Sequence, residues 1–330
     1  MILVTGGTGL VGAHLLIHLV ENGEHVRAIY RKKNKIQKTK SLFGHYNKSA
    51  LFDAIEWVQA DILDVPSLEH AFVNISKVYH CAAVISFDPR DENLLRKTNI
   101  EGTANIVNFC LAKGVQKLCY VSSVAALGDL APHETIITEE TEWNPEKHHN
   151  DYAISKYGAE MEIWRGQQEG LNVIIVNPGV ILGPGFEDQG SGQLIKKIAT
   201  GLLFYTKGTT GFVTVNDVVR IMRQLMESAI NNERYILIAE NIVFQDLFNT
   251  IADSVKTKRP SIEAKPYIME ITWRLHWFLC LFSGKTNNLS KDTVRSFLSK
   301  TKFSNEKIKT AINFSFTDVH QYIRENFSAN

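Results

Sequence analysis

A tyrosine and a lysine four residues apart, Tyr152 and Lys156, are the side chains best suited to acid–base chemistry in this sequence. In a helix, this spacing places the phenol and the ammonium on one face. A phenol has an ordinary pKa of about 10, and a nearby cation favours its ionised form. The positive end of the helix dipole adds to this effect. The pair is therefore predicted to pass a proton to or from a carbonyl or hydroxyl oxygen while a hydride moves at the adjacent carbon.

Two serines, Ser122 and Ser123, end an apolar segment upstream of that pair. The segment, residues 117–123, is predicted to be a strand, and open parallel sheets hold their ligands at the carboxyl ends of strands. A serine at such an end can hydrogen-bond the oxygen that exchanges the proton. The alternative, which the residues leave open, is a serine that only closes a turn.

The chain begins with an apolar stretch, Met1 to Thr5, that turns through spaced glycines into a helical segment. Glycine permits the tight turn, the approach of the backbone to a pyrophosphate and the close packing of helix on strand. The N–H groups at the helix start carry partial positive charge and can bind the phosphates. A dinucleotide site is therefore predicted, with contacts from Gly6, Thr8, Gly9, Leu10, Val11 and Gly12.

The order of the elements predicts the sheet that must hold these residues. Strand-like and helical segments alternate through the first half of the chain, as a parallel, doubly wound α/β sheet of the Rossmann type requires. The crossovers between strands are expected to be right-handed. The predicted strands are residues 2–5, 25–30, 54–60, 77–83, 117–123 and 171–177, and the predicted helices include residues 10–17, 90–113 and 151–168.

Beyond Pro178 the alternation gives way to a Gly/Pro-rich loop, helical segments and short strands. The change predicts a smaller, mostly helical C-terminal lobe that binds the substrate, while residues 212–238 return to the main sheet. We therefore expect a dinucleotide-binding Rossmann domain of residues 1–177 and 212–240. The substrate-binding lobe would comprise residues 178–211 and 241–330.

The composition excludes several classes of protein. With 330 residues, 44% of them hydrophobic and 22% charged, the chain can bury one large core or two modest ones, so it is neither disordered nor fibrous. A net charge of +1 supplies no global field for nucleic acid or acidic lipid. The four cysteines lack metal-ligand spacing, so we expect reduced thiols and no metal site. They are Cys81, Cys110, Cys119 and Cys280.

A cytoplasmic location is the default expectation, because the first strand begins at residue 2 and leaves no room for a signal or transit peptide. The most apolar late segment, residues 271–282, is shorter than the roughly 20 residues that span a bilayer, and it contains Arg274 and His276. No transmembrane segment is expected. A buried helix is predicted here, with a lid over an apolar pocket and a membrane-surface contact as the alternatives.

The glycine loop, the serine after the fifth strand and the Tyr-x-x-x-Lys pair together resemble the short-chain dehydrogenase/reductase superfamily in its extended, epimerase/dehydratase-like form. The likeness extends over nearly the whole chain. Further segments that share it are residues 60–64, 80–83, 99–105 and 177–180.

The resemblance implies roles for individual residues. In the family pattern the catalytic hydroxyl lies five residues before the glycine that ends the motif, here Gly128, which selects Ser123 over Ser122. Tyr152 would carry the proton, and Lys156 would also hold the nicotinamide ribose. The remaining cofactor contacts implied are Asp61 and Ile62 at the adenine, Ala82 and Ala83 on the ribose side, and Pro178 and Val180 at the nicotinamide.

The end of the second predicted strand bears on the choice of cofactor. An acidic residue about 20 positions after the glycine loop suits the ribose 2′-OH of NAD, whereas an arginine suits the 2′-phosphate of NADP. This chain has Arg31 there, and no Asp or Glu occurs between His25 and Phe52. We therefore expect Arg31 to bind the 2′-phosphate and NADP(H) to be preferred over NAD(H). The alternative for most of the lysines from Lys32 to Lys40 is a basic loop that only faces solvent.

Among extended relatives, nucleotide-sugar epimerases and dehydratases compete with reductases of ketones and aldehydes. Sugar dehydratases carry Asp-Glu directly after the catalytic hydroxyl residue, where this chain has Val124 and Ala125. Sugar-nucleotide enzymes also place arginines after the sixth strand, yet no arginine occurs between Asn177 and Asp217. The pattern looks more like the dihydroflavonol reductase and 3β-hydroxysteroid dehydrogenase branch. That likeness implies carbonyl–alcohol interconversion on a mostly apolar small molecule, with residues 84–87 lining the pocket or packing in the core.

Two alternatives stay open beside this reductase. The first is a nucleotide-sugar epimerase or dehydratase, and the second is a catalytically silent NADP-binding regulator. Such regulators typically lose the Tyr–Lys pair, which is present here. The resemblance also implies a homodimer in which the helices of residues 90–113 and 151–168 pair across a two-fold axis.

Overall fold

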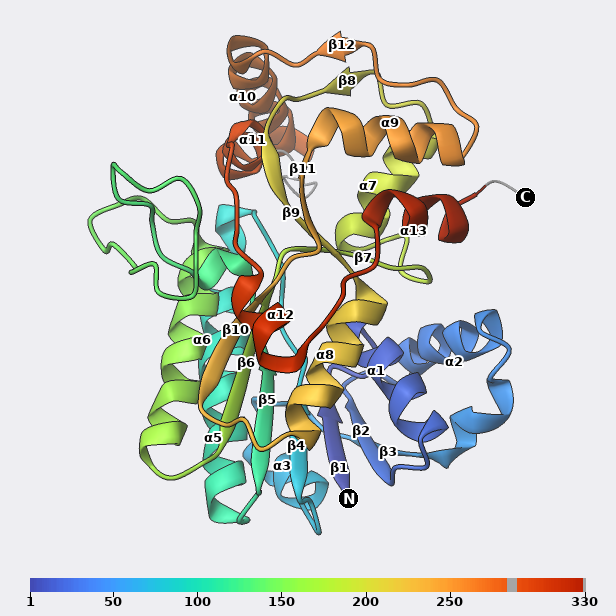
Figure 1. The fold of residues 1–330 in the computed structure, drawn as a ribbon, viewed down its shortest axis with the longest axis vertical. Helices are drawn as coiled ribbons and strands as arrows, with labels where there is room; N and C mark the ends of the chain where they lie inside the picture. The colour runs from blue at the N-terminus through green and yellow to red at the C-terminus, as the bar shows by residue number, and fades with distance from the viewer. Residues whose placement is uncertain (284–289, 329–330) are drawn as a thin grey trace.

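The computed structural model describes residues 1–283 and 290–328, with side chains described up to Arg274 and again from Ser290. A seven-stranded sheet of order β10-β6-β5-β4-β1-β2-β3 occupies the lower half of Figure 1. All its neighbouring strands are parallel, so the predicted doubly wound sheet is confirmed. The strands are β1 (Ile2–Thr5), β2 (Val26–Tyr30), β3 (Ile55–Gln59), β4 (Lys77–His80), β5 (Lys117–Val121), β6 (Val173–Pro178) and β10 (Glu233–Leu237).

Helices cover both faces of this sheet. One face packs against α1 (Leu10–Glu21), α2 (Ile36–His45) and α8 (Val215–Glu227). The other packs against α3 (Val65–Ala71), α5 (Gly102–Ala112) and α6 (Asp151–Gln168). Every residue of β5 and β6 is therefore buried, which explains why their sequences are mostly apolar.

The strand order reverses between β1 and β4. After β1 the chain continues to β2 and β3 on one side, and after β3 it crosses to β4 on the other side of β1. Connections that leave neighbouring strands in opposite directions open a crevice at their carboxyl ends, where doubly wound folds bind ligands. The glycine loop follows β1 at this crevice, and Ala82 and Ala83 follow β4.

The predicted helix over residues 90–113 is present, but its middle is π-helical and not α-helical. The structure has a 3-10 turn at Pro89–Asp91, then α4 (Glu92–Leu95), a π-helical segment at Arg96–Glu101, and α5. Asn99 lies in the π-helical segment and hydrogen-bonds Val84 and Ser155, two residues far from it in the sequence. π-Helical turns of this kind are frequent at functional sites.

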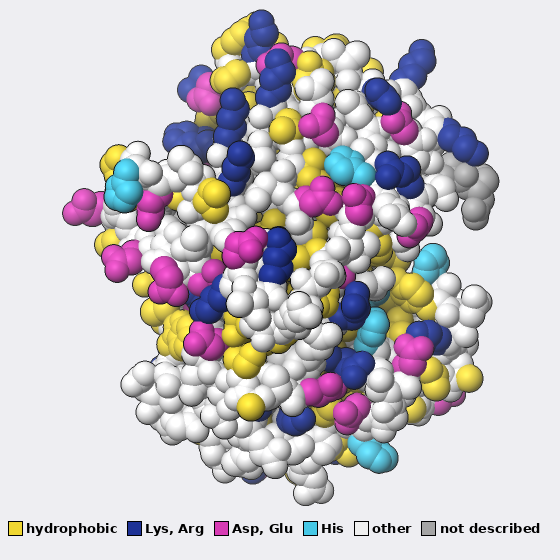
Figure 2. All heavy atoms as spheres, in the orientation of Figure 1, with side chains coloured by type: hydrophobic (Ala, Val, Ile, Leu, Met, Phe, Trp, Pro, Cys, Tyr) yellow, Lys and Arg dark blue, Asp and Glu magenta, His cyan; other side chains and the backbone are white. Residues whose placement is uncertain are grey.

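The upper part of Figure 1 is a smaller lobe built around short sheets. One sheet joins β7 (Val180–Leu182), β9 (Thr209–Thr214) and β11 (Glu240–Val243), and another joins β8 (Phe204–Tyr205) and β12 (Ile262–Glu263). Lys and Arg side chains gather over this lobe in Figure 2. The remaining helices here are α7 (Gly190–Ala199), α9 (Phe244–Ser254), α10 (Pro266–Ser283), α11 (Lys291–Leu298) and α13 (Val319–Asn326).

Residues 212–238 return to the main sheet only in part. Helix α8 and strand β10 do so, as predicted. Strand β9 does not, because it pairs with β7 and β11 in the small sheet. Strand β7 itself follows β6 after Gly179, whose backbone comes so close to Gly211 that an added Cβ would lie 2.3 Å from the Gly211 carbonyl oxygen.

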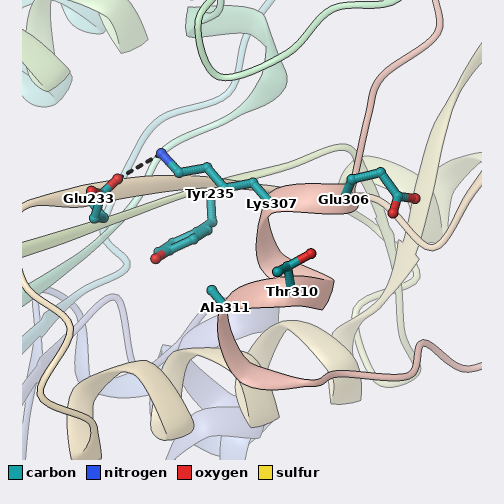
Figure 3. Close-up of a pocket in the computed structure, with 6 residues that line it drawn as sticks. All are labelled: Glu233, Tyr235, Glu306, Lys307, Thr310 and Ala311. Carbon is teal, nitrogen blue, oxygen red and sulfur yellow. Dashed lines mark ion pairs between the residues drawn. The ribbon is translucent and has the colours of Figure 1, made fainter.

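Near its end the chain comes back to the main sheet. Helix α12 (Glu306–Ile312) lies beside the edge strand β10, and Ile308 belongs to the core that packs α1 and α8 on the sheet. In Figure 3, Lys307 reaches across this contact to Glu233, with 2.7 Å between ammonium and carboxylate. Its Nζ also lies 5.3 Å from the ring centre of Tyr235. The shallow hollow beside these residues therefore belongs to the packing contact between α12 and β10.

The division of the chain into two domains stays a prediction.

The late apolar segment is helical, since residues 271–282 lie within α10. At its described start it is not buried, because Ile271 is 56% exposed. The side chains of residues 275–282 lie outside the described part. Within the described part of the chain, no helix is long and apolar enough to cross a membrane.

Replacing Gly12 by alanine is expected to lower the free energy of unfolding by about 1–3 kcal/mol and to weaken dinucleotide binding. The new Cβ would lie 2.3 Å from the Gly6 carbonyl oxygen. Gly44→Ala in α2 is the matched control, because its Cβ would meet only Ser49 Oγ, at 3.6 Å. Alanine should stabilise that helix by up to about 1 kcal/mol. Urea denaturation measures both variants, and equal stabilities would contradict the argument.

Candidate active site

The turn after β1 brings the backbone very close to the end of β4. Gly6 has a φ of +70°, and a Cβ there would lie 2.7 Å from the Ala82 amide nitrogen. The Gly9 amide donates to the Gly6 carbonyl at 2.9 Å, which closes the turn. The left-handed conformation and the lack of space both require glycine at position 6.

The start of α1 is open to an anion. Its N-cap is Gly9, which supplies no side-chain hydrogen bond, and the first turn of α1 contains no acidic residue. The first backbone N–H groups of a helix have no partner within the helix, and they carry partial positive charge. These features fit a pyrophosphate. The loop from Gly6 to Gly12 is therefore suited to hold the pyrophosphate of a dinucleotide.

A buried hydrogen-bonded chain supports the loop after β4. His80 Nδ1 lies 2.7 Å from Thr5 Oγ1, and its Nε2 lies 3.0 Å from Thr103 Oγ1. Thr5 Oγ1 also accepts a hydrogen bond from the Ala82 amide at 3.1 Å. Burial lowers the pKa of His80 to about 3, so this ring is neutral. The chain holds Ala82 against the glycine turn.

Tyr152 and Ser123 are brought together, as the resemblance implied. Tyr152 lies in the first turn of α6 and is buried. Burial raises the pKa of its phenol, and a hydrogen bond with the Ser123 side chain acts in the opposite direction. Ser123 Oγ also accepts the Ala125 amide at 3.1 Å, which fixes the turn after β5. The other candidate, Ser122, contacts Glu160 and lowers the pKa of that carboxyl.

The ammonium of Lys156 was expected to act on the Tyr152 phenol, but its hydrogen-bond partners are different. Its ammonium is buried and donates to the Tyr120 hydroxyl at 2.7 Å and to the Val121 carbonyl at 2.8 Å. Burial lowers its pKa to about 7, with Glu160 acting in the opposite direction. The expectation that the lysine would lower the pKa of Tyr152 is therefore wrong for this structure. Burial dominates the pKa of the phenol, and the lysine charge is directed at the end of β5.

Sequence reasoning missed Glu160, the next residue at a spacing of four on the same face of α6. It is fully buried, and its Oε1 accepts a hydrogen bond from Asn177 Nδ2 at 2.5 Å. Arg234 NH1 lies 3.3 Å from its Oε2. Asn177 Nδ2 also donates to the Ser123 carbonyl at 2.9 Å, so this network anchors the backbone of the catalytic serine candidate. The continued spacing from Tyr152 through Lys156 was the available signal.

Asn99 ties the loop after β4 to α6. Its Oδ1 accepts the Val84 amide at 2.8 Å, and its Nδ2 donates to the Val84 carbonyl at 3.0 Å and to Ser155 Oγ at 2.9 Å. Ser155 in turn donates to the Tyr152 carbonyl at 2.8 Å. The π-helical segment thus acts as a positioning element for the residues around the phenol.

Two exposed apolar residues, Ile85 and Phe87, lie on the loop after β4. The Phe87 ring meets the Tyr152 ring edge-on, with 5.6 Å between ring centres, and remains 39% exposed. Ile85 is 63% exposed. Of the two interpretations given to residues 84–87, the structure excludes core packing for Ile85 and Phe87. It places the Phe87 ring beside the phenol.

Arg31 and Asp61 face each other across the ends of β2 and β3. The closest approach of guanidinium and carboxylate is 4.0 Å, and the Arg31 side chain is 57% exposed. Such a loose, exposed pair contributes little to stability. Ile62 is held by a hydrogen bond from Asn105 Nδ2 to its carbonyl at 2.9 Å. These residues border the crevice on the side where the adenosine is predicted.

Pro178 and Val180 lie on either side of Gly179, where β6 passes into β7. Pro178 is buried and pairs with Leu237 in β10, whereas Val180 pairs with Phe212 in the small sheet. The two residues are therefore where the main sheet meets the upper lobe. Their assignment to the nicotinamide stays a prediction.

The cysteines are not arranged for metal binding in the described residues, where no cluster of metal-ligating side chains occurs. Cys81, Cys110 and Cys119 are free thiols. Burial raises the pKa of Cys81 to about 12, so its thiol is protonated. The side chain of Cys280 lies outside the described part.

The open glycine turn at the switch point of a parallel sheet places this chain among the dinucleotide-binding enzymes of the short-chain dehydrogenase/reductase fold. The chain belongs to the NAD dependent epimerase/dehydratase family, whose model matches residues 2–239.

Similar proteins agree with this placement. The chain is 32% identical to a putative dihydroflavonol 4-reductase from Synechocystis sp. over 74% of this chain and 69% of that protein. It is 30% identical to anthocyanidin reductase from Arabidopsis thaliana over 72% of this chain and 75% of that protein. The crystal structure of gox2253 superimposes with a TM-score of 0.80 at 27% identity, covering 99% of this chain and 96% of that one. The protein is thus an NAD(P)-dependent oxidoreductase of the extended short-chain dehydrogenase/reductase family.

Ser123→Ala is expected to lower kcat for alcohol oxidation by roughly a hundredfold, because one hydrogen bond to the reacting oxygen is lost. It should also move the pH profile to higher pH. Oxidation needs the phenolate, and the contact with Ser123 lowers the pKa of Tyr152. Ser122→Ala is the matched control. Steady-state rates across the pH range test this, and an unmoved profile would remove Ser123 from its role.

Proposed function

We propose that this enzyme interconverts a carbonyl and an alcohol on a mostly apolar small molecule, with NADP(H) as its cofactor. The observation that carries the proposal is the exposed Phe87 ring, which meets the catalytic phenol edge-on, with exposed Ile85 two residues earlier on the same loop. The lack of arginine between Asn177 and Asp217 points the same way, since a sugar diphosphate would need cations. The names of the reductase relatives support this class of substrate.

Tyr152 is the proposed proton donor in reduction. Since burial raises its pKa, the phenol is protonated at neutral pH and can give its proton to the carbonyl oxygen. Ser123 would hydrogen-bond the same oxygen and hold it in line with the phenol. When bound, the nicotinamide group supplies or accepts the hydride at the neighbouring carbon.

Lys156 and the glycine turn have supporting roles in this proposal. Lys156 fixes the end of β5 through Tyr120 and Val121, and its remaining ammonium hydrogen is available to a ribose hydroxyl. The pyrophosphate would be held at the start of α1 by the loop from Gly6 to Gly12.

Turnover of a panel of apolar ketones and aldehydes, beside UDP- and dTDP-sugars, tests the substrate class. We expect reduction of the apolar carbonyl compounds. Tyr152→Phe should lower kcat by roughly a hundred- to ten-thousandfold while leaving NADPH binding intact. Activity confined to the sugar nucleotides would favour the alternative, an epimerase or dehydratase, and would overturn this substrate assignment.

The preference for NADP(H) rests on Arg31. Its guanidinium is exposed and held only loosely by Asp61, so it can turn to a 2′-phosphate at small cost. The neighbouring Lys38 is already committed to Asp188, with 2.5 Å between charged atoms. Lys33 is exposed and serves as a nearby reference cation.

Arg31→Ala is expected to weaken NADPH binding by roughly ten- to a hundredfold and to change NADH binding little. Lys33→Ala, the matched control, should change neither by more than a few fold. Isothermal titration of wild type and both variants with each cofactor gives the six dissociation constants. If wild-type protein bound NADH as tightly as NADPH, the cofactor assignment would be withdrawn.

A homodimer through α5 and α6 is also part of the proposal. These helices cover one face of the sheet, and α6 exposes a large apolar side chain, Met161, which is 39% exposed. A two-fold axis through this face would pair α5 and α6 of one subunit with those of the other.

A further inference from the structure

Five large apolar side chains are exposed together at the top of the upper lobe. We call them the apolar patch: Leu203 (59% exposed), Phe204 (44%), Ile262 (44%), Tyr267 (62%) and Ile271 (56%). The pairing of β8 with β12 places Phe204 directly beside Ile262, although the two are far apart in the sequence. Helix α10 begins a few residues after β12, and its Tyr267 and Ile271 share one helix face. In Figure 1, β8, β12 and α10 lie side by side at this end.

The segments that carry the apolar patch are strongly basic. Residues 196–207 and 253–274, here called the basic end, contain eight Lys and Arg against three Asp and Glu, a net +5 in a chain whose total is +1. The rest of the chain is therefore net negative. Figure 2 shows the same asymmetry, with dark blue side chains gathered over the upper lobe.

Ion pairs within the basic end use all three of its carboxylates. They join Lys207 to Glu263, Arg259 to Asp253 and Arg274 to Glu270, at 2.8, 2.7 and 2.8 Å. The excess charge therefore resides on five other exposed lysines. These are Lys196, Lys197, Lys256, Lys258 and Lys265.

We propose that this end of the molecule docks on the surface of an anionic lipid bilayer. Exposed apolar side chains on segments rich in exposed lysines match the two parts of such a surface, the acyl boundary and the negative headgroups. A nucleic acid would use the cations but leave five apolar side chains in water. The proposal does not depend on the substrate of the enzyme. It makes the upper lobe, rather than the catalytic crevice, the part that contacts lipid.

Flotation of the full-length protein with phosphatidylcholine vesicles, with and without phosphatidylglycerol, tests the proposal. Binding is expected only with the anionic lipid and should weaken as salt is added. Replacing Lys256, Lys258 and Lys265 together by glutamine should weaken binding by about a hundredfold, since each lysine near the surface contributes about 1 kcal/mol. The matched control removes as many exposed lysines elsewhere, Lys97, Lys113 and Lys147, and should bind like wild type.

A second pair of variants tests the apolar part. Tyr267→Ser with Ile271→Ser should weaken vesicle binding by roughly tenfold or more. Val65→Ser with Val73→Ser, two exposed positions at the start of α3 and just after its end, should not. NADPH binding by every variant reports that the fold is retained.

Equal binding to neutral and anionic vesicles, or equal losses in the control variants, would overturn the proposal. So would a complete lack of vesicle binding. If, in addition, Tyr267→Ser with Ile271→Ser dissociated an oligomer in sedimentation velocity, the apolar patch would be a self-association surface instead.

Discussion

Burial of ionisable groups along one face of α6 is the constraint on which the rest of the site depends. Tyr152, Lys156 and Glu160 follow one another at a spacing of four residues, and all three are buried against the sheet. A buried charge without partners is very costly, so neighbouring elements must supply them. Tyr120 and Val121 of β5 accept from the lysine, while Asn177 of β6 and Arg234 of β10 meet the glutamate. Three strands are thereby held in register with the helix that carries the chemistry.

The same burial decides the chemistry. In water, an ammonium beside a phenol would favour the phenolate, but here removal from solvent lowers the pKa of Lys156 and raises that of Tyr152. The protein without its cofactor therefore holds a protonated phenol in contact with Ser123. A proton donor of this kind suits carbonyl reduction.

Much of the fold was predictable because helices cover both faces of the main sheet. Its strands are then mostly apolar and stand out between turns, as β5 and β6 do. The π-helical segment within the helix over residues 90–113 was not predictable. The side chain that accompanies it, Asn99, has partners at Val84 and Ser155, and nothing near Asn99 in the sequence indicates them. The position of β9 was missed for a similar reason, since its partners β7 and β11 are distant in the chain.

The sequence by itself determined the features that depend on local spacing. The glycines that permit the turn before α1 and the placement of Tyr152 and Lys156 on one helix face follow from backbone geometry within a few residues. Only the tertiary structure decided which groups surround these side chains. It directed Lys156 to β5 instead of the phenol, set Phe87 against Tyr152, and joined Phe204 to Ile262 on one exposed surface. Burial and pKa depend on atoms that the fold brings together from distant segments, which no local pattern specifies.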